Sequence, residues 1–215
     1  MNEILLEGLK RIGVSDYKEK AEKLEIYIKE LLFFNPSLKL IGDKDENGIT
    51  IRHILDSASG YMCFKEYTRP GDSIADLGSG SGLPGIVLAI LFPDRSFVLV
   101  ERMQRRVGFL RGVVAKLALS NVRIEDKDIK DIKERYSALT CRAFHPLSDI
   151  AKDSVKLLGP SGVALMYKGL RKSVEKELSD LDVSGFLFDA KVIDLDVPYL
   201  EQERVMCVLS GWRKK

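Results

Sequence analysis

The chain has 215 residues, of which 45% are hydrophobic and 31% are charged, and its formal net charge is +2. These values are typical of a globular domain with a substantial core, and so small a net charge does not by itself demand a nucleic-acid partner. Three scattered cysteines and only two histidines make a disulfide framework or a metal site unexpected, and no apolar run has the length of a membrane span. We therefore expect a cytoplasmic protein that binds no metal.

The first third of the chain is expected to be helical. Residues 2–34 are predicted to form two helices, the second beginning after Ser15 as its N-cap and ending at Asn35-Pro36. A further helix is predicted over residues 51–67. We expect residues 1–70 to be a helical extension packed on a core domain of residues 71–215, so that the two form one structural unit.

From residue 73 onward, strands and helices alternate. Such alternation predicts a parallel sheet covered by helices on both faces. Two long strands at the end of the chain are predicted to pair antiparallel at one edge. The predicted strands are 73–77, 96–100, 121–125, 137–143, 162–167, 185–196 and 203–210, and the predicted helices between them are 83–92, 103–118, 147–158 and 171–181.

A glycine-rich turn joins the first strand to its helix, reading Asp76-Leu77-Gly78-Ser79-Gly80-Ser81-Gly82-Leu83-Pro84-Gly85. Glycines allow a positive φ and let the backbone approach a ligand closely. The spacing Gly80-x-Gly82-x-x-Gly85 also fits a dinucleotide site, which would make the chain an NAD-dependent oxidoreductase. An acid before the turn suits the sulfonium and ammonium groups of S-adenosylmethionine better than it suits a pyrophosphate. The turn therefore favours adenosylmethionine, with NAD as the alternative and a purely structural glycine turn as a third interpretation.

Further polar residues follow the next strands, at the sheet edge where ligands bind in such folds. Glu101 is predicted to accept the ribose hydroxyls, although an acid can also simply open a helix. Asp128 and Ile129 fall where the adenine usually lies, in a stretch that is equally typical of an exposed turn. Arg142 is predicted to reach the methyl donor or the substrate, and its alternative role is a salt bridge.

Several other residues have a functional and a structural interpretation. Arg52, His53 and Lys168 are candidates for phosphate contact, although for His53 a hydrogen-bonded core position is the favoured interpretation. Cys141 is expected to be a buried strand thiol rather than a nucleophile. The basic cluster of one helix is expected to be a solvated face; it comprises Arg102, Arg105, Arg106, Arg111 and Lys116.

With these motifs in place, the chain resembles the glucose-inhibited division protein B family, the bacterial small-subunit ribosomal RNA guanine-N7 methyltransferases. The resemblance covers nearly the full length. It rests on Arg52-His53-Ile54-Leu55-Asp56-Ser57, on Asp76 through Gly85 and on Arg105-Arg106-Val107-x-Phe109-Leu110, and it extends to Arg142-Ala143-Phe144, Lys168-Gly169 and Glu203-Arg204.

The resemblance implies a class I adenosylmethionine-dependent methyltransferase of the Rossmann-like α/β class. Its sheet would have seven strands, mainly parallel with antiparallel C-terminal edge strands. The implied reaction methylates N7 of a guanine in the decoding-region (530) loop of 16S rRNA, at position 527 in the usual numbering of that RNA. The partner would be 16S rRNA or the small ribosomal subunit, and the protein would act as a monomer. A noncatalytic rRNA-binding assembly factor with the same fold is a further alternative.

Motifs and resemblance together give a set of site residues. Arg142 and Lys168 are expected to position the substrate, and Arg52, Lys168 and Arg204 to contact RNA. The family commonly has Asn-Leu-Thr where this chain has Lys39-Leu40-Ile41, and it has Arg-x-Glu-Glu where this chain has residues 128–131. The cofactor is expected to contact Asp76, Gly78, Ser79, Gly80, Leu83, Glu101, Asp128, Ile129, Lys130 and Arg142.

Overall fold

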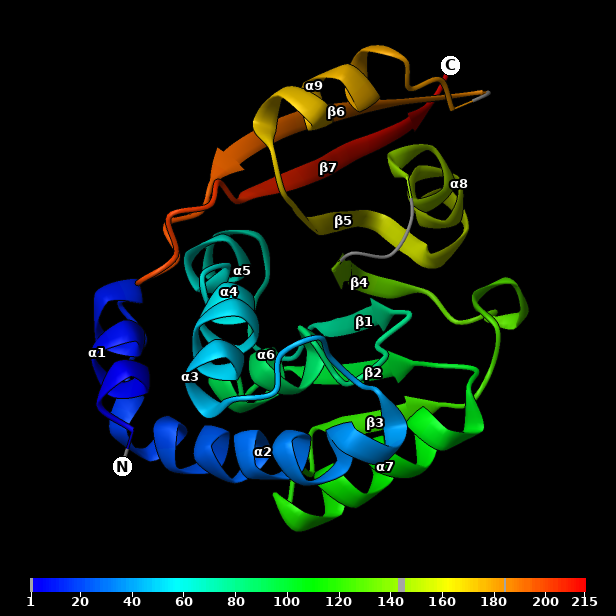
Figure 1. The fold of residues 1–215 in the computed structure, drawn as a ribbon. Coiled ribbons are helices and arrows are strands. Elements are labelled where there is room, and N and C mark those ends of the chain that lie inside the picture. Colours follow the sequence, from blue (N-terminus) through cyan, green and yellow to red (C-terminus); the bar gives the residue numbers. More distant parts are fainter. Residues whose placement is uncertain (1, 143–145, 184) are drawn as a thin grey trace.

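A seven-stranded sheet organises the chain in a computed structural model that describes residues 2–142, 146–183 and 185–215. The strand order is β3-β2-β1-β4-β5-β7-β6, as Figure 1 shows. Strands β1 to β5 are parallel, and β7 runs antiparallel to both β5 and β6. The predicted parallel sheet with an antiparallel edge pair is therefore confirmed. The strands are β1 (Ser73–Leu77), β2 (Ser96–Val100), β3 (Val122–Glu125), β4 (Tyr136–Arg142), β5 (Leu158–Lys168), β6 (Phe186–Asp194) and β7 (Val205–Lys214).

Helices precede the sheet and alternate with its strands. They are α1 (Glu3–Ile12), α2 (Tyr17–Leu38), α3 (Glu46–Ile49), α4 (Asp56–Ala58), α5 (Tyr61–Tyr67), α6 (Gly85–Leu91), α7 (Gln104–Lys116), α8 (Leu147–Leu157) and α9 (Arg171–Ser179). The single helix predicted over residues 51–67 is wrong in detail, because a π-helical segment at Thr50–Leu55 is followed by the short helices α4 and α5. A short 3₁₀ turn covers Ile129–Asp131. Residue 143, the predicted end of the fourth strand, lies outside the described residues.

Helix α2 differs from its prediction at both ends. It begins after Asp16, because the hydroxyl of Ser15 lies 3.2 Å from the hydroxyl of Tyr61 and does not cap the helix. At the other end Pro36 does not stop it. The last turn contains this proline and is closed by the N–H of Lys39, which donates to the carbonyl of Asn35. A proline removes one donor, and here the following residues supply the closing bond.

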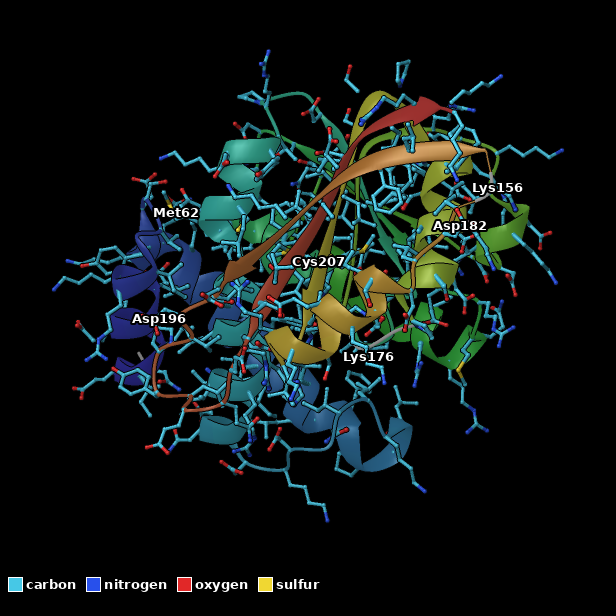
Figure 2. All side chains as sticks on the ribbon, turned by 90° about the horizontal axis from the view of Figure 1, so that it is seen from above. Met62, Lys156, Lys176, Asp182, Asp196 and Cys207 are labelled. Carbon is cyan, nitrogen blue, oxygen red and sulfur yellow. The ribbon has the colours of Figure 1, made fainter. Side chains whose placement is uncertain are left out.

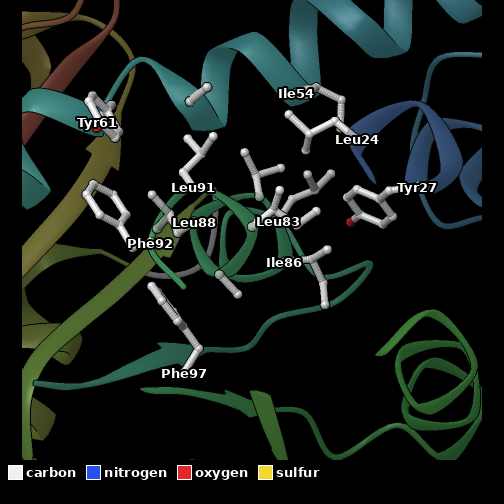
Figure 3. Packing of buried hydrophobic residues seen from close by; sticks show 14 of the residues in the cluster. Leu24, Tyr27, Ile54, Tyr61, Leu83, Ile86, Leu88, Leu91, Phe92 and Phe97 are labelled. Atoms are coloured by element: carbon white, nitrogen blue, oxygen red, sulfur yellow. The ribbon is translucent and has the colours of Figure 1, made fainter. Parts of the chain in front are cut away.

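The N-terminal helices cover one face of the sheet through α6. Every residue of α6 is buried, as the apolar run from Ile86 to Leu91 predicts. Figure 3 shows Leu88 and Leu91 packed between Ile54 on one side and Phe97 of β2 on the other. One hydrophobic cluster therefore joins the helices before residue 70 to the sheet.

The other face of the sheet is covered by α8 and α9. Leu147 and Ile150 of α8 and Val174 of α9 belong to the second hydrophobic cluster, and Figure 1 shows α8 on the opposite side of the sheet from α4. Figure 2 shows Lys176 of α9 extending outward while Cys207 of β7 lies in the interior. Within residues 2–142, 146–183 and 185–215, no helix has the length and apolar character needed to cross a bilayer.

Candidate cofactor and substrate site

The glycine turn follows the carboxyl end of β1 and adopts backbone conformations that favour glycine. The φ angles are +70° at Gly78, +58° at Gly80 and +92° at Gly82. A side chain at Gly85 would meet Leu99 and Asp76, because a Cβ there would lie 2.6 Å from Asp76 Oδ2. These glycines therefore serve both the shape of the loop and the packing of α6 against the sheet.

Asp76 lies beneath the turn. Its side chain is buried, and Oδ2 accepts a hydrogen bond from the N–H of Gly85 at 3.0 Å. Burial raises the pKa of this carboxyl to about 7, and the Gly85 hydrogen bond opposes that rise. A cavity described below opens at the turn. Asp76 does not line this cavity, whereas the other residues expected to contact the cofactor do. Its contacts are those of a group that fixes the start of α6.

We expect the substitution Asp76→Asn to stabilise the protein increasingly as pH rises. Between pH 3.8 and about 7, Asp76 is ionised in the unfolded chain but still protonated in the folded protein. Ionisation therefore favours the unfolded chain, and the stability of the wild type falls as pH rises through this range. The amide cannot ionise, and it retains an acceptor for Gly85. The gap in thermal midpoint between variant and wild type should grow over this range and stay constant above it. An equal gap at about pH 5 and about pH 8 would contradict this assignment, and Asp149→Asn, at an exposed acid of α8, is the control.

Glu101, directly after β2, is tied to the turn by its carboxylate. Oε2 accepts from the N–H of Gly80 at 2.9 Å, and Oε1 accepts from the N–H of Met103 at 2.8 Å. Arg106 lies 3.8 Å from Oε2. An ionised carboxylate has about four acceptor sites, so both oxygens can still accept hydroxyl groups. Glu101 therefore organises the loop and retains the capacity to bind a ribose.

A cavity of about 710 Å³ opens above the turn, between the ends of β1 and β2 and the segment after α2. This volume lies in the range of about 300–1,000 Å³ that small-molecule sites occupy. Asp128, another lining residue, accepts from the N–H of Lys130 and pairs with Arg102 at 3.1 Å. We call this the donor cavity; of the residues expected to contact the cofactor, it is lined by Gly78, Ser79, Gly80, Leu83, Glu101, Asp128, Ile129, Lys130 and Arg142.

Sequence reasoning missed some residues of the donor cavity. Leu40 and Ile41, from the segment between α2 and α3, line it. In the sequence, the one feature that drew attention to this segment was the departure of Lys39-Leu40-Ile41 from the family pattern. Arg106 also lines the cavity, although it was grouped with a solvated helix face. These contacts join segments far apart in the sequence, so no local pattern could reveal them.

A second cavity, of about 570 Å³, adjoins the first. We call it the acceptor cavity, and its cationic lining residues are Arg52, Arg142, Lys168 and Arg204. Lys168 Nζ lies 3.0 Å from Glu177 Oε2. The structure thus brings together the four cationic residues that the sequence marked as contacting or positioning RNA. They belong to the π-helical segment, to the end of β4, to the end of β5 and to the position directly before β7.

Asp56 anchors two of these arginines. Its Oδ2 lies 2.7 Å from Arg142 Nη1 and its Oδ1 lies 3.1 Å from Arg204 Nε. The Asp56 side chain is 6% exposed, so both contacts are shielded from water. Arg142 therefore forms the salt bridge that was the structural alternative in the sequence analysis. It also lines both cavities. Sequence reasoning gave Asp56 no role of its own.

Cys141 is not expected to act as a nucleophile. Its thiol is buried and lies 3.5 Å from the sulfur of Met166. Burial raises its pKa to about 12, so the reactive thiolate is scarce. The variant Cys141→Ala should keep the reaction at this site within about twofold of the wild-type rate. A rate loss beyond tenfold, with an unchanged thermal midpoint, would instead indicate covalent participation.

Over the same described part of the chain, no three His, Cys, Asp or Glu side chains gather where they could hold a metal ion. His145 lies outside the described residues, as do Ala143 and Phe144 of the motif that begins at Arg142.

Comparison with known proteins identifies relatives over most of the chain. The family model described as GidB, rRNA small subunit methyltransferase G, matches residues 20–205. A Treponema denticola protein named ribosomal RNA small subunit methyltransferase G is 33% identical, covering 97% of this chain and 94% of that protein. The protein of that name from Treponema pallidum is 37% identical over 84% of this chain and 81% of its own length.

Solved structures share the fold at low sequence identity. A precorrin-6y C5,15-methyltransferase from Geobacter metallireducens matches with a TM-score of 0.54 and 16% identity, covering 72% of this chain and 87% of that one. The protein TYW2 of M. jannaschii, solved in complex with AdoMet, matches with a TM-score of 0.52 and 14% identity, covering 73% and 77%. These neighbours agree with the Rossmann-like methyltransferase fold predicted from the sequence.

Proposed function

Because the chain belongs to the rRNA small subunit methyltransferase G family, we propose that it methylates N7 of a guanine in the 530 loop of 16S rRNA. S-adenosylmethionine is the methyl donor. The protein acts as a monomer on the RNA or on the small ribosomal subunit. The observation that carries this proposal is the junction of the two cavities at Arg142, which lines both of them.

The donor cavity has groups that suit adenosylmethionine. Its glycine turn brings backbone close to a ligand without side chains in between, and Glu101 has spare acceptor sites for ribose hydroxyls. Asp128, Ile129 and Lys130 also line the cavity, and they are the groups that would hold the adenine. When bound, adenosylmethionine supplies an electrophilic methyl group on a positively charged sulfur.

The acceptor cavity suits a single nucleotide turned out of an RNA loop. Arg52, Lys168 and Arg204 line it and supply positive charge for phosphate oxygens. Enzymes that modify a base inside a folded nucleic acid commonly extrude that base into a pocket. In this arrangement Arg142 orients the guanine at the boundary with the donor cavity, and Lys168 holds the nucleotide from β5.

The chemistry needs positioning rather than proton removal. Guanine N7 carries a lone pair at neutral pH, so it can attack the methyl carbon as the bond from carbon to sulfur breaks. The positive charge then moves from sulfur to the purine, and no proton leaves N7. Acceptor oxygens around the donor cavity stabilise this positive charge while it moves from the sulfur to the purine. The residues present therefore match a transfer that depends on alignment.

An NAD-dependent oxidoreductase fits the turn less well. A pyrophosphate at this place would need the free N–H groups at the start of α6. The N–H of Gly85 instead donates to Asp76 Oδ2, so the Asp76 carboxyl already occupies this donor. Calorimetry with adenosylmethionine and with NAD separates the two sites, and we expect heat of binding with adenosylmethionine alone.

Mapping of N7-methylguanine in 16S rRNA tests the proposal in cells. Cells that lack the gene should lose one modified guanine in the 530 loop, and expression of the wild-type chain should restore it. An unchanged map would refute the proposal. A noncatalytic assembly factor predicts that purified protein binds the RNA without incorporating label from methyl-labelled donor.

A further inference from the structure

We propose that Asp43 and His53 form a positioning pair that holds Arg142 at the boundary between the donor and acceptor cavities. This inference rests on the proposed function, because Arg142 matters here as the group that aligns the guanine. It assigns to Asp43 and His53 a positioning role that the sequence motifs did not give them. The contacts of the His53 ring carry the inference.

The His53 ring bridges an acid and an arginine. Its Nε2 lies 2.7 Å from Asp43 Oδ2, and its Nδ1 lies 3.1 Å from Arg142 Nη2. A guanidinium can only donate, so Nδ1 must accept the hydrogen bond from Arg142. The ring proton of the neutral imidazole then lies on Nε2 and is donated to Asp43. Both partners therefore specify the same tautomer.

The charges around the ring favour its neutral form. The pKa of His53 is lowered to about 4, chiefly by burial and then by the nearby Arg142 and Arg52, against the opposing effect of Asp56. Asp43 faces the other ring nitrogen. A protonated ring would present an N–H toward the guanidinium, so the neutral ring is the form that keeps Arg142 in place.

The other side of Arg142 is fixed as well. Nη1 donates to Asp56 Oδ2 at 2.7 Å and to the carbonyl of Arg52 at 3.1 Å. Together with His53, these contacts hold the guanidinium plane from the π-helical segment and from α4. Its remaining N–H donors have no partner among residues 2–142, 146–183 and 185–215, so they are available to a substrate.

Asp43 is itself held in place by the segment that borders the donor cavity. The side chain of Asn35 donates to the carbonyl of Asp43 at 2.8 Å and accepts from the N–H of Ile41 at 3.0 Å. Arg52 pairs with the Asp43 carboxylate. Since Ile41 lines the donor cavity, the segment that shapes one cavity also orients the histidine at the other.

Within the described part of the chain, His53 and Arg142 are the residues shared by the linings of the two cavities. The methyl group must pass between donor and base at this boundary. A displacement of an aligning group by about 1 Å can cost about 10²-fold in rate. A pair that fixes Arg142 therefore acts on the rate of transfer more than on the affinity for either ligand.

The variant His53→Leu tests the pair, because leucine fills similar space and cannot accept a hydrogen bond. We expect single-turnover transfer to small subunits that lack the modification to slow by about 10- to 100-fold. The Kd for adenosylmethionine should stay within about threefold of wild type, which also shows that the variant is folded. The variant His53→Asn keeps an acceptor near the Nδ1 position and should recover most of the rate.

A double-mutant cycle shows whether His53 acts through Arg142. On an Arg142→Ala background, His53→Leu should cause no further loss, because the group that it positions is already gone. Asp43→Asn should slow transfer, because one amide oxygen cannot accept from both His53 and Arg52 as the carboxylate does. Asp45→Asn should not slow it, since Asp45 accepts from the N–H of Gly48 and asparagine keeps that N-cap.

The outcomes separate the inference from the function on which it rests. Wild-type transfer together with an unchanged rate for His53→Leu would overturn the positioning pair alone. Additive losses in the cycle would do the same, because His53 would then act independently of Arg142. Absence of transfer by the wild-type protein would overturn the proposed function and this inference with it.

Discussion

Replacing Arg142 with alanine is expected to slow methyl transfer by about 10²- to 10³-fold, the loss typical of removing one preorganised donor from an active site. The guanidinium lines both cavities, and its anchors Asp56 and His53 hold it before any ligand arrives. The single-turnover rate at saturating adenosylmethionine measures this effect. The affinity for adenosylmethionine should fall far less than the rate.

Two further variants make the Arg142 result interpretable. Arg142→Lys keeps the charge and loses the fork of donors, so we expect a rate between those of wild type and Arg142→Ala. Arg213→Ala, at an exposed arginine of β7 that pairs with Asp189, should leave the rate unchanged. A wild-type rate for Arg142→Ala would show that the guanidinium serves only the salt bridge to Asp56.

Replacing Glu101 with alanine is expected to weaken adenosylmethionine binding by about 100-fold. Two hydrogen bonds from ribose hydroxyls to a carboxylate contribute about 1.5 kcal/mol each at the least, and about 1.4 kcal/mol corresponds to a tenfold change in Kd. The alanine variant also frees the N–H groups of Gly80 and Met103 that the carboxylate now accepts. Calorimetry gives the Kd directly.

The Glu101 variants can separate ribose binding from loop organisation. Glu101→Gln retains one acceptor oxygen and should lose less affinity than Glu101→Ala. Glu134→Ala removes an exposed acid that pairs with Arg123 on the surface, and it should bind adenosylmethionine as the wild type does. If Glu101→Ala bound the cofactor with unchanged Kd, the carboxylate would serve the loop alone.

The sequence predicted the fold wherever local patterns decide it. Strand and helix alternation from residue 73 onward gave the sheet, and the apolar run at Ile86 predicted a buried α6. The errors lie where a distant partner competes with a local rule. Ser15 is drawn away from α2 by Tyr61, and the turn containing Pro36 is completed by the N–H of Lys39. A propensity for capping or breaking a helix cannot include such contacts.

The site was predictable to the extent that its residues follow strands in order. Glu101, Asp128 and Arg142 each come after or at the end of a strand, and the structure places all three at the donor cavity. Asp43 lines the acceptor cavity and Ile41 lines the donor cavity. Both come from the segment after α2, which only the tertiary fold brings to these cavities. Their roles therefore could not be read from spacing along the chain.

The most direct test of this account is methyl transfer with purified components, using labelled adenosylmethionine and small ribosomal subunits from cells that lack the gene. Digestion of the RNA and identification of the labelled nucleoside then report which atom was modified and where. We predict N7-methylguanosine at a single site in the 530 loop, and strongly reduced label with Arg142→Ala. Label at another atom or another loop, or no label with cofactor bound, would contradict the account.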